Sequence, residues 1–296
     1  MSGFFPLGIA GREELFLIFQ AYYGRANDAI EEGRTIFLKP GISTSCFYPQ
    51  TPEEAVDFLS AYRIPHIEIF FNSFSELRPE YLKELQAVLR NGGVTVLSVH
   101  PFTSGMEPIL FFSDYERRVE DGLEMYRRYF EAANLLGAEI LVFHGDRRDS
   151  NCPDERYFER FHRLFCLGKE FGVTVAQENV ERCRSGELSF LRRMQEALGA
   201  EAQFVLDVKQ ARRSGEDPTA YLDSLGQNIC HLHISDGGAA GDCLPIGDGE
   251  MDFSVFFKRL EEFRYQGGVI LELYRHNYRM REELIESYEK LRRIIG

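Results

Sequence analysis

Seven short apolar runs of this 296-residue chain end in a glutamate, a histidine or an aspartate. In chain order, these residues are Glu68, His100, His144, Glu178, Asp207, His233 and Glu272. Each lies late in its run, and apolar neighbours alternate with it, as they do along a β-strand. A single residue of this kind is usually a helix cap or a solvated loop residue.

Seven such residues in succession are harder to explain in that way. Carboxylates that point inward together repel one another unless protons or a cation neutralise them. A bound divalent metal ion is the simplest neutraliser, so the pattern predicts a metal site.

The segment "CHLHISDGG" (residues 230–238) holds two histidines one residue apart, His231 and His233. Because side chains alternate along a strand, both imidazoles point to the same face. His233 is nearer the carboxyl end, and we predict that it is a ligand. His231 lies one pleat deeper, roughly 6 to 7 Å along the strand. We expect it to orient its neighbour or to fill the interior with a satisfied N–H.

The elements that must position these residues recur along the chain as β-rich runs, each followed by a stretch with helical periodicity. Residues Thr51, Ser113, Asp217 and Asp252 offer helix starts, either as N-caps or just before a proline. The eight runs are "GISTSCF" (41), "HIEIFF" (66), "VTVLSVH" (94), "EILVFHG" (139), "VTVAQEN" (173), "AQFVLDV" (203), "ICHLHIS" (229) and "GVILELY" (268).

Eight such units without a Pro-, Gly- or Ser-rich linker predict an α/β protein with a single (β/α)8 TIM barrel over residues 41–296. A doubly wound sheet is the alternative, because counting strands does not prove closure. In a parallel barrel, catalytic groups gather at the carboxyl ends of the strands. Residues 1–40 fit no unit and are predicted to be an N-terminal extension with a short amphipathic helix at 15–23, too short to span a bilayer.

Charge and cysteine content restrict the partners. There are 47 acidic and 34 basic residues, which give a formal net charge of −13. This charge disfavours nucleic acid as a partner, and no segment predicts membrane association. The six cysteines are scattered without a CxxC pair, which favours reduced thiols and a cytoplasmic location.

Five segments, taken in order, resemble the xylose-isomerase-like barrels, the superfamily of sugar isomerases and epimerases and of the endonuclease IV type of DNA-repair enzyme. The resemblance covers residues 41–296. The segments are "QEN" (177–179), "VLDVKQARRSGEDP" (205–218), "HLHISD" (231–236), "LPIGDGEMDF" (244–253) and "ILELY" (270–274).

This resemblance implies a metal centre. In the ketose 3-epimerase branch, one divalent ion is held by residues that match Glu178, Asp207, His233 and Glu272. Such a set favours Mn²⁺ or Mg²⁺, with Co²⁺ or Zn²⁺ as alternatives. By resemblance, Glu178 and Glu272 also serve as catalytic base and acid on opposite sides of the substrate. The resemblance therefore implies a metal-dependent sugar, sugar-phosphate or sugar-acid isomerase or epimerase that moves a proton through an enediolate.

The chain departs from both branches. The substrate histidine of the epimerases is replaced by Gln210 and their arginine by Ala239, so a free ketohexose substrate is not carried over. His100 and His144 match two zinc histidines of the endonuclease branch, but Gln210 and Cys243 replace others. An inosose-dehydratase-like lyase is the main alternative. An endonuclease IV-like hydrolase and a non-catalytic sugar-binding barrel are the others.

The expected partner is a small-molecule carbohydrate, and a homo-oligomer is left open. Arginines near helix N-termini oppose the helix dipole, so some are expected to meet an anionic substrate group, although Arg-Arg pairs also occur on helices here. The glycine-rich residues 235–242 are expected to form a mobile loop at the site mouth or an ordinary connector. The predicted substrate-binding residues are Glu68, His100, His144, Lys209, Gln210, Arg184 and Arg275.

Overall fold

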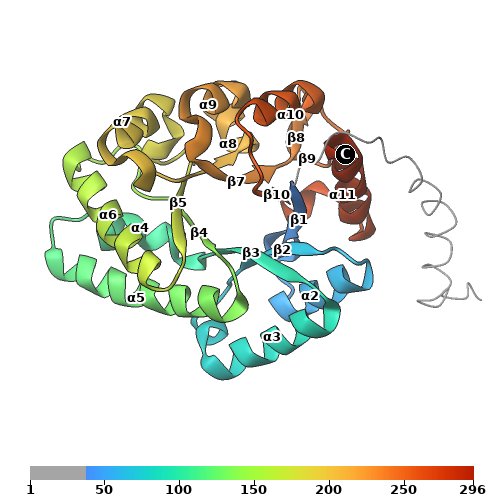
Figure 1. The fold of residues 1–296 in the computed structure, drawn as a ribbon, viewed down its shortest axis with the longest axis horizontal. Coiled ribbons are helices and arrows are strands. Elements are labelled where there is room, and N and C mark those ends of the chain that lie inside the picture. The colour runs from blue at the N-terminus through green and yellow to red at the C-terminus, as the bar shows by residue number, and fades with distance from the viewer. Residues whose placement is uncertain (1–37) are drawn as a thin grey trace, which may run out of the picture. The chain divides into compact units, whose positions relative to one another are not determined.

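Eight parallel strands close into a barrel in the computed structural model, which describes residues 38–296 (Figure 1). Around the ring the order is β1-β10-β7-β6-β5-β4-β3-β2. The predicted barrel is therefore confirmed, and closure excludes the doubly wound sheet. The barrel strands are β1 (Lys39–Ser43), β2 (His66–Phe70), β3 (Thr95–His100), β4 (Ile140–Phe143), β5 (Thr174–Glu178), β6 (Phe204–Asp207), β7 (Ile229–Ile234) and β10 (Gly268–Leu271).

Helices surround these strands (Figure 1). Strand β1 begins at Lys39, two residues before the expected boundary at 41. The helix expected at 15–23, and most of the extension expected over 1–40, lie outside the described residues. The helices are α2 (Pro52–Ala61), α3 (Pro79–Gly92), α4 (Glu107–Phe111), α5 (Glu116–Leu136), α6 (Asp154–Glu170), α7 (Leu188–Leu198), α8 (Val208–Arg213), α9 (Pro218–Leu225), α10 (Phe253–Glu262) and α11 (Glu282–Ile295).

Three of the four predicted helix starts are confirmed. Thr51 and Glu54 form a capping box at α2, in which each side chain bonds to the other residue's backbone N–H. Asp217 and Asp252 cap α9 and α10 with their carboxylates. The prediction at Ser113 is wrong, because α5 begins only at Glu116 and has no side-chain cap.

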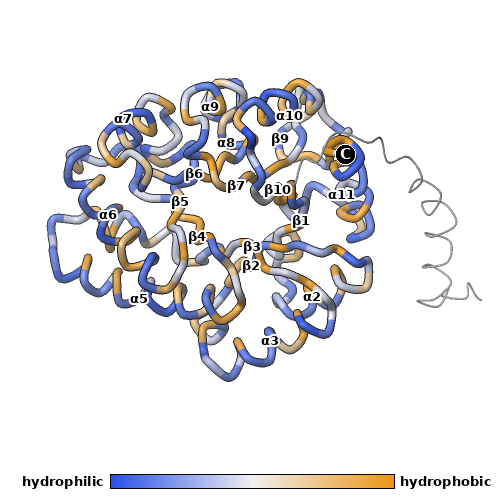
Figure 2. Tube along the Cα trace, viewed as in Figure 1, coloured by the Kyte–Doolittle hydropathy of each residue, from blue (hydrophilic) through white to orange (hydrophobic). Residues whose placement is uncertain are grey.

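Hydrophobic residues concentrate along the strands and on the helix faces turned toward them (Figure 2). Inside the barrel, Val142, Ala176 and Val205 form a buried apolar cluster contributed by three neighbouring strands. The strands of a parallel barrel are buried on both faces, which explains why the eight β-rich runs are rich in apolar residues. The polar strand ends lie above this cluster, toward the carboxyl ends.

The glycine-rich segment after β7, expected to be a mobile loop or a connector, contains a short hairpin. Strands β8 (Asp236–Gly238) and β9 (Gly241–Leu244) pair antiparallel. Arg213 of α8 pairs with Asp242, with 3.2 Å between Nη2 and Oδ1. Asn277, in the segment after β10, donates to the carbonyl oxygens of Asp242 at 3.1 Å and Cys243 at 2.8 Å. The hairpin thus connects the segments that follow β6, β7 and β10.

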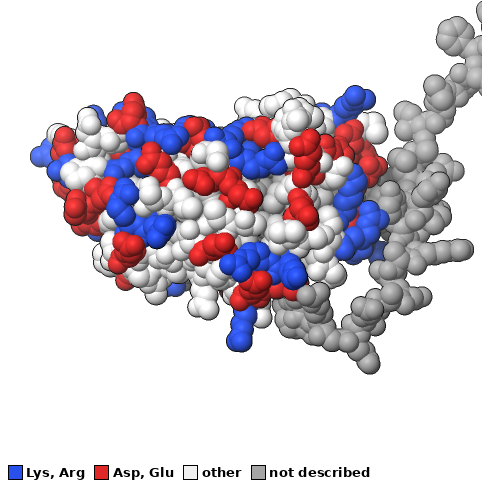
Figure 3. All heavy atoms as spheres, turned by 90° about the horizontal axis from the view of Figure 1, so that it is seen from above, with Lys and Arg blue, Asp and Glu red and all other residues white. Residues whose placement is uncertain are grey.

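Acidic and basic side chains are interspersed over the face shown in Figure 3. The six cysteines, all of which lie within the described residues, are free thiols. Within residues 38–296, no helix combines the length and hydrophobicity that crossing a membrane requires.

Candidate metal centre and active site

Four side chains from four neighbouring strands converge at the carboxyl end of the barrel. Glu178 ends β5, Asp207 ends β6, His233 is the fifth residue of β7, and Glu272 follows β10 directly. One ligand atom of each lies within 4.8 Å of those of the other three. The strand register explains this arrangement, since His233 is paired with both Asp207 of β6 and Ile270 of β10.

His233 lies between carboxylates on both sides of its ring. Its Nδ1 is 3.1 Å from Glu178 Oε1, and its Nε2 is 3.0 Å from Glu68 Oε2. Burial opposes a charge on the ring, but Glu68 and Glu272 raise the pKa of His233 well above its usual value. Burial likewise opposes the charge on Glu178, but His144 and His233 hold its pKa well below the usual range.

Lys209 places a buried ammonium among the acidic side chains. Its Nζ is 3.1 Å from Asp207 Oδ2 and 3.0 Å from Glu272 Oε2. Burial opposes this charge, but Asp207 and Glu272 raise the pKa of Lys209 well above normal. Even so, burial and the neighbouring Glu178 and Glu272 raise the pKa of Asp207 to about 6. The cluster therefore has more buried negative charge than this lysine neutralises.

The four converging residues fit a divalent ion. Asp207 Oδ1 accepts the backbone N–H groups of Lys209 and Gln210 at the start of α8. Its Oδ2 is buried and forms no well-directed hydrogen bond, although the Lys209 ammonium lies 3.1 Å away, so it can turn a lone pair to an ion. Three carboxylates and one imidazole form the oxygen-rich donor set that Mn²⁺ and Mg²⁺ prefer.

Two further histidines adjoin this cluster. His144 Nε2 is 2.8 Å from Glu178 Oε2 and 3.0 Å from His100 Nε2. Burial opposes a charge on His144, but Glu178 raises its pKa. Burial and the neighbouring His144 lower the pKa of His100 to about 4. His100 thus favours the neutral form, in which Nε2 can accept a hydrogen bond from His144, whereas His144 favours the charged form.

A cavity of about 430 Å³ opens above these groups. Two carboxylates line it, Glu178 and Glu272, together with polar groups from His100, His144, Lys209 and Gln210, all of which the sequence predicted. Asp207 and His233 do not line it. The remaining lining residues are Ser45, Tyr48, Phe70, Asn72, Phe102, Ser104, Arg182, Leu273 and Tyr274. Such a mixture of aromatic walls and a few convergent polar groups is typical of a small-molecule site.

Three predicted substrate-binding residues lie elsewhere. Glu68 is fully buried beneath the cavity, in the middle of β2. Arg184 bonds to Asp154 and to the carbonyl oxygen of Cys152. Arg275 donates to the carbonyl oxygen of Tyr278 at 3.0 Å. None of the three lines the cavity.

Arg182 is the arginine that lines the cavity. The sequence prediction named Arg184 as the substrate-binding arginine of this segment and missed Arg182. Its positive charge opposes, without reversing, the rise in the pKa of the nearby His144, and within residues 38–296 no carboxylate forms an ion pair with it. The other arginines that follow the clustered strand ends each contact an acidic side chain or a carbonyl oxygen; they are Arg147, Arg148, Arg184, Arg212, Arg213 and Arg275.

Sequence reasoning also missed Glu107, a fully buried carboxylate on α4. Its Oε2 accepts the backbone N–H groups of His144, at 2.9 Å, and Gly145, and Tyr126 donates to Oε1. Burial raises the pKa of Glu107 to about 7 despite these donors. An acidic residue in an otherwise apolar segment was the available signal. Glu107 fixes the backbone that carries His144 into the cavity.

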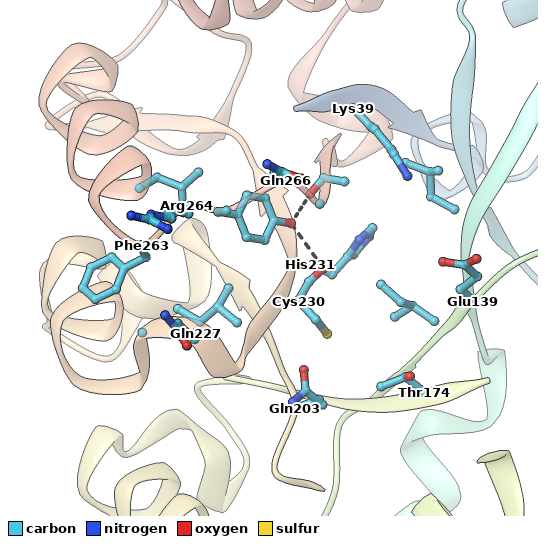
Figure 4. A pocket seen from close by; sticks show the side chains of 18 of the residues that line it. Lys39, Glu139, Thr174, Gln203, Gln227, Cys230, His231, Phe263, Arg264 and Gln266 are labelled. Atoms are coloured by element: carbon cyan, nitrogen blue, oxygen red, sulfur yellow. Dashed lines mark hydrogen bonds between the residues drawn. The ribbon is translucent and has the colours of Figure 1, made fainter. Parts of the chain in front are cut away.

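A second cavity, of about 650 Å³, opens at the amino ends of the strands (Figure 4). Figure 4 shows Lys39, Glu139, Thr174, Gln203 and His231 among the residues that line it. No group of His, Cys, Asp and Glu that could hold a metal lies wholly among its described lining residues. Because barrel enzymes gather catalytic groups at the opposite end, the cavity above Glu178 is the candidate site.

The chain is similar to known proteins over most of its length. A family model described as "Xylose isomerase-like TIM barrel" matches residues 50–294. An uncharacterised protein of Methanocaldococcus jannaschii is 24% identical over 250 residues, covering 79% of this chain and 83% of that protein. An uncharacterised protein of Mycobacterium leprae is 23% identical over 259 residues, covering 80% and 89%.

Solved structures share the fold at lower identity. A D-tagatose 3-epimerase-like protein has a TM-score of 0.73 at 21% identity, covering 87% of this chain and 97% of that one. The 3-keto-D-glucoside 4-epimerase of E. coli has a TM-score of 0.69 at 19% identity, covering 87% and 98%. A sugar phosphate isomerase/epimerase from Parabacteroides distasonis has a TM-score of 0.69 at 18% identity, covering 92% and 98%.

Proposed function

Because the chain belongs to the xylose isomerase-like TIM barrel family, we propose that it is a metal-dependent isomerase or epimerase of a sugar, sugar phosphate or sugar acid. The reaction is a proton transfer next to a carbonyl group, through an enediolate. Solved structures of similar fold include a D-tagatose 3-epimerase-like protein and a 3-keto-D-glucoside 4-epimerase, which supports this reaction class.

One observation carries the proposal: two carboxylates face a single cavity from separate strands. Glu178 ends β5 and Glu272 follows β10, and β6 and β7 lie between these strands in the ring. A sugar held above His233 would have a carboxylate on either side. One can accept the proton from carbon while the other returns one, which inverts a centre or moves the carbonyl.

Each glutamate has its own partner for proton exchange. His144 Nε2 is 2.8 Å from Glu178 Oε2, and Lys209 Nζ is 3.0 Å from Glu272 Oε2. His100 and Gln210 line the same cavity, where they can hydrogen-bond sugar hydroxyl groups and orient the carbon between the two acids. A divalent ion held by Glu178, Asp207, His233 and Glu272 would stabilise the negative charge of the enediolate.

The test is a panel of ketoses, aldoses, inososes and their phosphorylated forms, incubated with Mn²⁺ in heavy water and analysed by NMR. The proposal expects a product of unchanged composition that has gained deuterium at one carbon. A lyase of the inosose-dehydratase kind, the alternative, would yield a product that has lost water. The isomerase proposal would be rejected if no member of the panel were converted, or if only inososes were converted and the product had lost water.

Arg182 provides a prediction about the substrate. Its guanidinium lines the cavity and pairs with no carboxylate among residues 38–296, so it is suited to a phosphate or carboxylate of the substrate. Arg182→Met should therefore raise KM for an anionic sugar about 10-fold or more and leave kcat nearly unchanged. Steady-state kinetics of the preferred substrate and of its neutral analogue measure this effect.

The matched control is Arg148→Met. Arg148 lies in the preceding loop, does not line the cavity, and pairs with Glu181 at 3.4 Å and Glu187 at 3.3 Å. Its replacement should leave KM unchanged. Equal KM values for the two variants would show that Arg182 does not bind the substrate.

A further inference from the structure

Glu68 differs from the other predicted site residues in its depth. It is the third residue of the five-residue strand β2, it is fully buried, and it lines neither of the two cavities described above. Its carboxylate crosses the barrel interior to reach His233 on β7. Burying a charge in this way is costly unless every lone pair has a donor.

The hydrogen-bond directions around Glu68 can be assigned. Ser43 Oγ donates to Oε1 at 3.0 Å, and Ser98 Oγ donates to Oε2 at 2.8 Å. The single hydroxyl hydrogen of Ser98 is used in this bond. The 3.0 Å contact between Ser98 Oγ and His231 Nε2 therefore has the imidazole as its donor.

His233 completes this set with Nε2 at 3.0 Å from Glu68 Oε2. An ionised carboxylate only accepts hydrogen bonds, so this contact requires a hydrogen on Nε2. A histidine binds a metal ion as the neutral imidazole, which carries one hydrogen, so in that form a hydrogen on Nε2 leaves the lone pair of Nδ1 available. Nδ1 is the nitrogen that faces the cluster, 3.1 Å from Glu178 Oε1 and 3.8 Å from Glu272 Oε2.

We infer that Glu68 is a positioning residue, which fixes the ring and tautomer of His233 so that Nδ1 is the nitrogen offered to the divalent ion. This inference rests on the proposed function and deepens it, replacing the expectation that Glu68 binds substrate. A carboxylate behind a histidine ligand both orients the ring and makes it a stronger base. Ser43, Ser98 and His231 in turn hold Glu68 in place.

The test is the affinity for Mn²⁺ alone, measured by calorimetry on the purified full chain. Glu68→Gln removes the charge while keeping nearly the same shape, and its amide can donate to Nε2 and so favour the wrong tautomer. We expect Mn²⁺ binding to weaken about 10- to 100-fold. Glu68→Asp keeps the charge and should recover part of the loss.

The matched control is Glu201→Gln, which neutralises a carboxylate that contacts a different histidine, His162, at 2.6 Å, outside the four converging residues and the cavity above them. It should bind Mn²⁺ as tightly as the native chain. Equal affinity of the native chain and folded Glu68→Gln would overturn the inference and leave the proposed function standing. A native chain that binds no Mn²⁺ would instead reject the proposed function.

A second measurement decides the matter even if Glu68→Gln fails to fold. In the ¹⁵N-labelled native chain saturated with Mg²⁺, histidine NMR reports which ring nitrogen carries hydrogen. The inference expects a protonated Nε2 on His233 and a metal-bound Nδ1. A protonated Nδ1 would refute it.

Discussion

Glu178→Gln and Glu272→Gln are each expected to lower kcat about 10²- to 10⁴-fold, the contribution usual for a general acid or base. Both side chains face the cavity, and an amide can neither accept the substrate proton nor return one. Steady-state kinetics at saturating Mn²⁺ and substrate measure the effect. Circular dichroism should show an unchanged fold, because glutamine keeps the shape of each side chain.

Two comparisons separate proton transfer from metal binding. Asp207→Asn alters the cluster at a carboxylate that does not line the cavity. This variant should bind Mn²⁺ more weakly but recover much of its rate when the Mn²⁺ concentration is raised. Glu178→Gln and Glu272→Gln should not recover in this way. Glu181→Gln, at an ion-paired loop residue, is the control for an unrelated carboxylate. If Glu178→Gln or Glu272→Gln keeps a kcat above about one tenth of the native value, the glutamate replaced in that variant is not the acid or base.

Removal of divalent metal with EDTA is expected to abolish turnover, and Mn²⁺ should restore it. It should also lower the melting temperature, because an ion that binds only the folded chain stabilises it. At a free ion concentration 100 times Kd, this stabilisation is about 2.7 kcal/mol. For a chain of this size it corresponds to about 5 °C or more, measurable by scanning calorimetry with and without Mn²⁺.

The control for this prediction is the same titration on Asp207→Asn. If Mn²⁺ stabilises through the four converging residues, the shift in this variant should be clearly smaller at equal Mn²⁺. If Mn²⁺ does not change the melting temperature and turnover is complete in EDTA, the proposed function does not depend on a metal ion.

The barrel could be predicted because its signals are local. The strands alternate with helical patterns along the whole chain, and period two identifies which residues point inward. What period two does not give is depth. Glu68 is followed by two more strand residues and lies below the cavity, whereas Glu178 ends its strand and lines it. Sequence alone does not mark the last paired residue of a strand to this accuracy.

The loop residues were harder to predict for a different reason. Arg182 and Arg184 follow the same strand, yet a short 3-10 turn at Arg184–Gly186 directs Arg184 to Asp154, leaving Arg182 at the cavity. Likewise, the β8–β9 hairpin depends on contacts with Arg213 and Asn277, which are distant in sequence. Such tertiary contacts leave no periodic pattern.

Because of that hairpin, two groups of loop segments at the rim of the cavity differ in how well they should tolerate substitution. The hairpin ties together the segments that follow β6, β7 and β10, so altering one of them disturbs the ion-holding geometry of the others. Tyr48, Asn72 and Phe102 line the other part of the mouth, on segments that follow β1, β2 and β3, and contribute none of the four converging side chains. Directed evolution for a new sugar should therefore be aimed at that second part, where diversity costs least in metal affinity.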